Sequence, residues 1–393
     1  MDILNSYNKD QIDVINIIKD LCKSCNIKAY IVGGAVRDSI LGKSTKDIDI
    51  CINKDPKIVI DNLSFVKKYE YHSQFQTSTI EFNNGIVIDL IRCRKETYEK
   101  NGSLPIIEPS CIEDDLFRRD FTINSLAYDI INNEIIDLFN GLLDLRNRQL
   151  KKIHSNSYAE DPTRIFRAIK YSVRYGLELQ DKNEIIRSIN KGDINTISSD
   201  RIIKELFLMC GEDNWIENLA LCNDLGVLKL EAHFLGIENC LGSYEDINLR
   251  ILNIFYSLKD EKYIDIFINN SFLDKDLKKS IKYYYYNKDK IVDLLMKAMD
   301  NYEICSVLKN IDLYALMILC WNTELKYKII NYVYKLKEVK LHINGEHLSK
   351  LGINEGENIG RILKFIMKLK LNTGIKDDKK YLVDNLGEII KCL

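Results

Sequence analysis

Two aspartates, Asp47 and Asp49, stand two residues apart in a segment where polar and apolar residues alternate, Asp47-Ile-Asp-Ile-Cys-Ile52. This alternation predicts a β-strand with one buried face, on which side chains two residues apart point the same way. Two carboxylates on one face can hold Mg²⁺, which prefers oxygen ligands and substrate phosphates. Metal ions held in this way can catalyse phosphoryl transfer by stabilising the attacking and leaving oxygens. Taken alone, the same pattern is more typical of a solvated strand face.

A pair of glycines precedes the two aspartates. Gly33 and Gly34 stand between an apolar segment, residues 29–32, and a predicted helix, residues 35–41. Glycines at such a turn let backbone N–H groups approach an anion, which the helix N-terminus also favours. Arg37 lies one turn into the helix and can reach the same anion. The turn therefore predicts a phosphate site, although a Gly-Gly pair alone is usually only a turn.

A third carboxylate, Asp89, interrupts the apolar strand predicted over residues 86–92. An acidic side chain in an apolar strand is costly unless it is paired or bound to a metal. Two interpretations are open: a third catalytic carboxylate, or a salt bridge with Arg92 or Arg94.

Two arginine-rich segments follow. The first, Arg118-Arg119-Asp120-Phe-Thr-Ile-Asn124, suits phosphate and ribose contacts because arginine pairs oxygens with two N–H groups at once. The second begins a predicted helix, Asp161-Pro-Thr-Arg164-Ile-Phe-Arg167-Ala-Ile-Lys170, in which residues spaced by three share one side. There an aspartate can accept and an arginine can donate, so the pair can read the edge of a base. The alternatives are a surface salt-bridge cluster for the first segment and a helix cap for the second.

The elements that must position these residues indicate an α+β protein. Strand-like segments are confined to the first 145 or so residues, with a loop predicted over residues 95–112. From Asp161 onward, apolar residues recur at helical spacing in nearly every segment. The 393 residues are enough for two to four packed units.

Composition narrows the class of protein. No apolar run approaches the roughly 20 residues that span a bilayer, and the N-terminus is polar, so we expect a cytoplasmic protein without a membrane partner. The net charge of −2 does not exclude nucleic acid, because binding depends on where the charges lie. The eleven cysteines, including the pair Cys22 and Cys25, are expected to be reduced and structural.

Together and in this order, the motifs resemble the class II tRNA nucleotidyltransferases, the bacterial-type CCA-adding enzymes, and their poly(A) polymerase relatives. The resemblance rests on Val-Gly-Gly-x-Val-Arg-Asp, Asp-x-Asp, a strand ending Asp-x-x-x-x-Arg, Arg-Arg-Asp-Phe-Thr-Ile-Asn and Glu-Asp-Pro-x-Arg-x-x-Arg, which fall within residues 30–170. It implies a small polymerase-β-like head, residues 1–145, followed by a helical neck (146–220), body (221–335) and tRNA-binding tail (336–393).

The resemblance also implies a role for each residue. It assigns metal-binding and catalytic roles to Asp47 and Asp49. It assigns a further catalytic role to Asp89, and it implies two Mg²⁺ ions as the cofactor. The nucleotide-binding residues are Gly33, Gly34, Arg37, Arg119, Asp120, Asn124, Asp161, Arg164, Arg167 and Lys170. Lys170 departs from the family, which often has arginine there. The loop that carries Glu96 and Tyr98, with Arg94 at its edge, corresponds to an element associated with A addition.

The expected reaction is addition of CCA to the 3′ end of tRNA from CTP and ATP. Four alternatives stay open: CC addition only, A addition only, a poly(A) polymerase, and an RNA-binding module with an inactive head. A small-molecule nucleotidyltransferase would share Asp-x-Asp but would not need the helix of Asp161 and Arg164. Two stretches rich in lysine and tyrosine, residues 275–290 and 326–340, suit RNA contacts, although tyrosines on helices are more often packed or half-buried. The sequence leaves the oligomeric state open.

Overall fold

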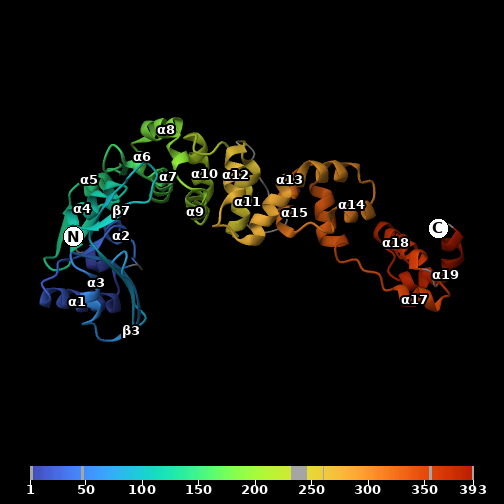
Figure 1. Cartoon of the computed structure of the whole chain (residues 1–393), viewed down its shortest axis with the longest axis horizontal. Coiled ribbons are helices and arrows are strands. Elements are labelled where there is room, and N and C mark those ends of the chain that lie inside the picture. The colour runs from blue at the N-terminus through green and yellow to red at the C-terminus, as the bar shows by residue number, and fades with distance from the viewer. Residues whose placement is uncertain (1–2, 46–47, 232–245, 260, 354–355, 392–393) are drawn as a thin grey trace. The chain divides into compact units, whose positions relative to one another are not determined.

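The computed structural model describes the chain except residues 1–2, 46–47, 232–245, 260, 354–355 and 392–393 (Figure 1). The chain divides into two compact units, Met1–Leu228 and Lys229–Leu393. The first unit joins a mixed β-sheet to helices, and the described residues of the second unit form helices. The α+β class predicted from the sequence is confirmed, whereas the four-part division into head, neck, body and tail stays a prediction. No described helix has the length and apolarity needed to cross a membrane.

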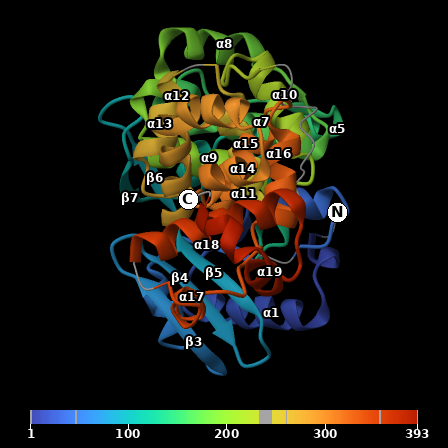
Figure 2. The same cartoon turned by 90° about the vertical axis from the view of Figure 1, so that its right-hand side faces the viewer.

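The sheet of the first unit has seven strands, and it brings two candidate catalytic residues together. Its central pair, β2 and β5, is parallel, and Asp49 lies opposite Asp89 in the register. The neighbouring pairs β3–β4 and β4–β5 are antiparallel, and Figure 2 shows these three strands side by side. In order across the sheet, the strands are β3 (Val66–His72), β4 (Thr77–Phe82), β5 (Val87–Arg92), β2 (Asp49–Ile52), β1 (Ala29–Val32), β8 (Leu126–Asp129) and β9 (Glu134–Asp137).

Helices surround the sheet and continue to the end of the first unit. The first, α1, begins at a capping box in which Asn8 and Gln11 each accept a backbone N–H from the other. Its apolar side, which includes Val14, Ile15 and Ile18, is buried. The helices of this unit are α1 (Lys9–Ser24), α2 (Gly34–Ile40), α3 (Pro56–Ile60), α4 (Ile112–Phe117), α5 (Gly141–Arg146), α6 (Ser157–Glu160), α7 (Thr163–Tyr175), α8 (Lys182–Lys191), α9 (Ser199–Cys210) and α10 (Trp215–Asp224).

The loop predicted over residues 95–112 is wrong in part. Within this segment β6 (Arg94–Thr97) pairs with β7 (Ile106–Pro109) as a two-stranded antiparallel hairpin outside the main sheet. The strands are short, their residues are half-buried or exposed, and a proline ends β7, so the sequence carries no apolar alternation there. A second short pair, β10 (Gln149–Leu150) with β11 (Glu178–Leu179), lies beyond the region where strands were expected.

Two clusters of buried apolar side chains lie among the described residues of the second unit. One includes Leu295, Leu308 and Leu319, and the other includes Leu348 and Ile366. The elements are α11 (Ile247–Ser257), α12 (Glu261–Asn269), α13 (Lys275–Lys297), α14 (Asn301–Leu308), α15 (Leu313–Cys320), α16 (Lys326–Asn331), a π-helical turn η5 (Tyr332–Leu336), α17 (Gly345–Lys350), α18 (Gly356–Thr373) and α19 (Asp378–Lys391).

The tyrosines of the two lysine-rich stretches divide between packing and exposure. Tyr284 packs against the first cluster and Tyr332 belongs to it. In contrast, Tyr286, Tyr327 and Tyr334 are 72%, 78% and 66% exposed. The packing interpretation therefore fits the first two tyrosines, whereas contact with RNA stays a prediction for the exposed tyrosines, which also include Tyr283.

Candidate active site

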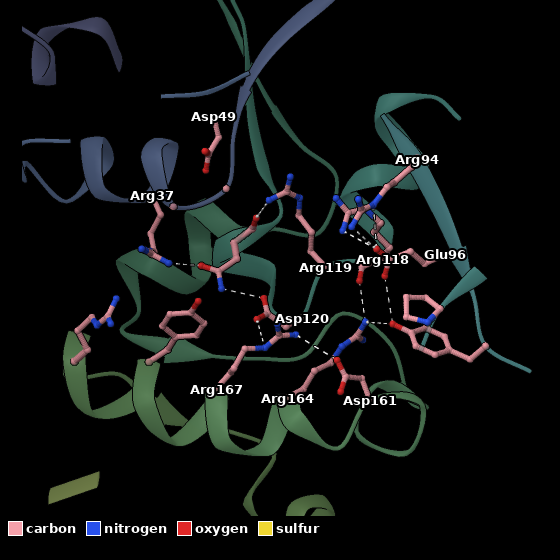
Figure 3. A pocket seen from close by; sticks show the side chains of 17 residues that line it. Arg37, Asp49, Arg94, Glu96, Arg118, Arg119, Asp120, Asp161, Arg164 and Arg167 are labelled. Atoms are coloured by element: carbon pink, nitrogen blue, oxygen red, sulfur yellow. Dashed lines mark hydrogen bonds and ion pairs between the residues drawn. The ribbon is translucent and has the colours of Figure 1, made fainter. Parts of the chain in front are cut away.

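A cavity of about 460 Å³ in the first unit gathers most of the predicted site (Figure 3). Seven arginines and four carboxylates line it among the described residues, so its charge favours an anion. Ten of the thirteen predicted residues are in this lining, namely Gly33, Gly34, Arg37, Asp49, Arg119, Asp120, Asn124, Asp161, Arg164 and Arg167. Three are not: Asp47 lies outside the described residues, and Asp89 and Lys170 are not part of the lining.

Asp49 opens strand β2, and its partner in the register is Asp89 on the parallel strand β5. Residues in register on neighbouring strands lie on the same face of a sheet, at a strand spacing of about 4.8 Å. The Asp89 carboxylate accepts a hydrogen bond from the Thr79 hydroxyl at 2.5 Å. The salt bridge considered for Asp89 is not found among the described residues, because Arg92 donates to Gln76 and Arg94 to Glu96. Two carboxylates thus share one face.

These two carboxylates fit a divalent cation in their chemistry. Mg²⁺ commonly binds one or two protein carboxylates and completes its shell with water and substrate phosphates. Within the described residues, no cluster of three or more metal-ligating side chains is present. Asp49 and Asp89 therefore supply a partial ligand set of oxygen donors, which suits Mg²⁺ better than a metal that needs nitrogen or sulfur ligands.

The turn between β1 and α2 requires glycine at its first position. Gly33 has φ +69°, and a Cβ there would lie 2.5 Å from Nη1 of Arg119. Glycine adopts this backbone conformation without the steric cost that other residues meet. The absence of a side chain thus lets the Arg119 guanidinium lie against the turn, at the edge of the cavity. Arg37, one turn further, is buried and donates to Asp38, Asn124 and the Tyr175 hydroxyl.

A buried carboxylate that the sequence analysis did not single out fixes the two arginines after α4. The Asp115 side chain is fully buried and lies 2.9 Å from Arg119 and 2.8 Å from Arg118. Burial raises the pKa of Asp115, but the two arginines outweigh it and hold the pKa below its usual value. The spacing of three and four residues from Asp115 to the arginines is the sequence signal for this contact.

Asp161 and the arginines around it form the other side of the cavity. The Asp161 carboxylate accepts from the Thr163 hydroxyl at 2.5 Å and from Arg201 at 2.7 Å, and Arg167 lies 3.8 Å away. Burial raises the pKa of Asp161, but Arg167, Thr163, Arg201 and Arg164 together lower it, so the carboxylate is ionised. Arg167 also lies 3.3 Å from Asp120, which ties the two carboxylates to one guanidinium.

Arg201 links the hairpin to Asp161. Its other terminal nitrogen donates to the carbonyl of Gly102 at 2.9 Å, and the N–H of Gly102 donates to the carbonyl of Glu160 at 3.0 Å. The segment between β6 and β7 is therefore fastened to the residues beside Asp161. The sequence gave no sign of this contact, because it joins residues 40 positions apart.

Lys170 does not line the cavity. Its ammonium group lies 3.7 Å from Glu205, and burial lowers its pKa. The described structure thus brings Asp161, Arg164 and Arg167 to the cavity and leaves Lys170 behind them. Conversely, the lining includes residues outside the predicted site set, namely Arg94, Glu96, Tyr98, Pro105, Arg118, Tyr171 and Arg174.

Comparison with known proteins identifies the sheet-containing part. Residues 29–151 match the family model of the poly A polymerase head domain. This part of the chain is similar to a poly A polymerase head domain. The resemblance predicted from the motifs is confirmed, since the curated relatives named below carry the names of tRNA nucleotidyltransferases.

The relatives extend beyond the head domain. An A-adding tRNA nucleotidyltransferase of Aquifex aeolicus is 28% identical over 88% of this chain and 45% of its own length. A CCA-adding enzyme of Lactobacillus helveticus is 24% identical over 92% of this chain and 94% of its own length. The chain spans about half the length of the A-adding relatives it matches.

Solved structures show the same fold along the chain. A CCA-adding enzyme in its apo form II aligns with a TM-score of 0.77 and 23% identity, over 100% of this chain and 98% of the other. Further structures with this fold are complexes of CCA-adding enzymes with CTP, with ATP and with tRNA. At this identity the likeness establishes the fold, and it leaves the reaction to be argued from the site.

Proposed function

We propose that this chain is a template-independent nucleotidyltransferase that adds CCA to the 3′ end of tRNA from CTP and ATP. The observation that carries the proposal is one cavity that combines a catalytic strand, marked by Asp49, with the Asp161 and Arg164 side chains. Phosphoryl transfer requires the first, and choice of a base without a template requires the second. A tRNA substrate implies a cytoplasmic location.

The residues of the cavity would have different roles in this reaction. Asp49, with Asp89 on the neighbouring strand and Asp47, would hold Mg²⁺. When bound, the metal ions stabilise charge on the attacking 3′-oxygen and on the leaving pyrophosphate. Arg37 and Arg119 would neutralise the triphosphate, because arginine pairs phosphate oxygens with two N–H groups at once.

The choice of base would depend on one hydrogen-bond acceptor, Asp161, beside one donor, Arg164. Cytosine and adenine each present an amino group next to a ring nitrogen that accepts, whereas uracil and guanine present a carbonyl next to an N–H. An ionised Asp161 accepts from the amino group, and Arg164 donates to the ring nitrogen. The same pair therefore admits cytosine and adenine and leaves the other two bases with unpaired polar groups, which is costly in a buried site.

A narrower reaction, addition of A alone, is the second candidate. Three of the relatives at 26–29% identity carry the name A-adding tRNA nucleotidyltransferase, although the CCA-adding relative covers this chain nearly end to end. Asp161 and Arg164 do not separate these reactions, because both bases satisfy them.

One assay distinguishes the candidates. Purified protein is given tRNA that lacks zero, one, two or three terminal nucleotides, with Mg²⁺ and CTP, ATP or both, and the products are sized to one nucleotide. We expect completion of CCA on all shortened substrates and no growth of the intact one. Addition of A to tRNA ending in CC, without any addition of C, would establish the A-adding reaction. Long A tails would indicate a poly(A) polymerase, and no product at all would favour an RNA-binding module.

A further inference from the structure

The guanidinium of Arg164 is buried and forms no direct ion pair with a carboxylate among the described residues. The residue as a whole is 2% exposed. Asp161, three residues earlier, is engaged by Arg201 instead. The partners of Arg164 are neutral: the Ser157 hydroxyl at 2.7 Å, the Arg118 carbonyl at 2.9 Å, the His154 ring nitrogen at 3.4 Å and the Tyr98 hydroxyl at 3.5 Å.

His154 is the imidazole among these partners, and its surroundings hold it in place. Its ring stacks on Phe117 with centroids 5.2 Å apart and an angle of 25° between the planes. Its Nε2 atom faces two groups of opposite charge, the Arg164 Nη1 at 3.4 Å and the Glu160 carboxylate at 3.6 Å. The protonation state of the ring therefore determines whether the ring favours Arg164 or Glu160.

We propose that His154 is a positioning residue that orients Arg164 for base selection and makes the choice of nucleotide dependent on pH. When the ring is neutral with its proton on Nδ1, Nε2 accepts a hydrogen bond from Arg164. When the ring is protonated, both nitrogens carry hydrogen, so the same contact becomes repulsive and Glu160 attracts the ring. The inference rests on the proposed function, since it assigns Arg164 to the base.

The charged groups around His154 set the direction of its titration. Burial lowers its pKa below the usual 6.5, Glu160 raises it, and Arg164 and Lys152 lower it. Lys152 is itself paired with Glu184. The net shift is downward, so the ring is neutral at pH 7 and above. Arg164 is held in place there, and it is released as the pH falls through the lowered pKa.

The test compares two nucleotides in the same buffer. Single-nucleotide addition is measured with ATP and with UTP on tRNA ending in CC, and the ratio of the two kcat/KM values is followed from pH 5.5 to 8. Effects of pH on the metal or on the attacking hydroxyl are common to both nucleotides and cancel in the ratio. We expect the ratio to fall roughly threefold to tenfold toward low pH, about the contribution of one ordinary hydrogen bond.

Two variants separate positioning from folding. H154F keeps the ring stacked on Phe117 but has no acceptor, so it should show the reduced ratio at every pH. H154Q keeps an acceptor oxygen that does not titrate, so it should keep a high ratio that no longer depends on pH. Unchanged pH dependence in both variants, or a ratio in wild-type protein that does not vary with pH, would overturn the inference. Failure of the proposed function would look different, because no nucleotide would be added at any pH.

Discussion

Replacing Gly33 by alanine tests the geometry of the phosphate turn. The new methyl group would lie 2.5 Å from Nη1 of Arg119, so the guanidinium must move. Gly33 also has φ +69° and ψ −126°, a conformation in which a side chain costs about 1–3 kcal/mol. Losing the contact of Arg119 with a phosphate would remove about 1.5–3 kcal/mol of binding. Since about 1.4 kcal/mol corresponds to a factor of ten, we expect G33A to bind ATP roughly 10- to 100-fold more weakly.

The matched control for G33A is G42A. Gly42 has φ +70° at the end of α2, but a Cβ there meets nothing within 4 Å. It therefore carries the backbone cost alone, and it should lose stability to a similar extent while binding ATP normally. Binding is measured by calorimetric titration and stability by thermal unfolding. If G33A bound ATP within twofold of wild-type protein, the close approach of Arg119 to the turn would not matter for the nucleotide.

Three further changes address other parts of the structure. R201A removes the 2.7 Å contact with Asp161, so the KM for ATP should rise about tenfold, the effect of one charge-assisted hydrogen bond, with tRNA affinity unchanged. D115N removes the buried carboxylate that pairs with two half-buried arginines, of which Arg118 keeps Glu96 at 3.1 Å, and should cost about 1.5–3 kcal/mol in chemical unfolding. Because the pKa of Asp115 is lowered, this stability is present above the usual value of 3.8 and is lost as the pH falls through the folded pKa, so acid unfolding should be steeper in wild-type protein than in D115N. Y327A removes an exposed ring and should weaken RNA binding by about 1–3 kcal/mol if the Tyr327 ring stacks on a base, without changing the melting temperature. Y284A removes a packed ring and should instead lower the melting temperature.

Local sequence patterns predicted those helices and strands that are specified by their own residues. The start of α7 near Asp161 and its helical spacing act over a few neighbouring residues. Strand β2 was visible for the same reason, because its alternation of polar and apolar residues reports one buried face. The β6–β7 hairpin was missed because its strands gain their order from each other and not from an apolar side.

The candidate site shows the same division between local and distant information. Ten residues that were predicted from the ordered motifs line the cavity, because each motif carries its own chemistry. What they left out are residues that act on the motif residues from elsewhere in the chain. Arg201 reaches Asp161 from another helix, and Tyr98, which the resemblance placed in the loop associated with A addition, approaches Arg164 from the hairpin. Such contacts depend on the packing of elements, which no local pattern encodes.

The central claim is that the face of β2 and β5 carries the chemistry while the rest of the protein binds its substrates. The most direct test is single-turnover addition by D49A, with tRNA binding measured on the same samples. Removing one metal-binding carboxylate should reduce the rate of addition by several orders of magnitude. The tRNA affinity should remain within about twofold of wild-type, because the proposed RNA contacts lie elsewhere. Normal turnover in D49A would contradict the account, since the reaction would then be carried out at another site.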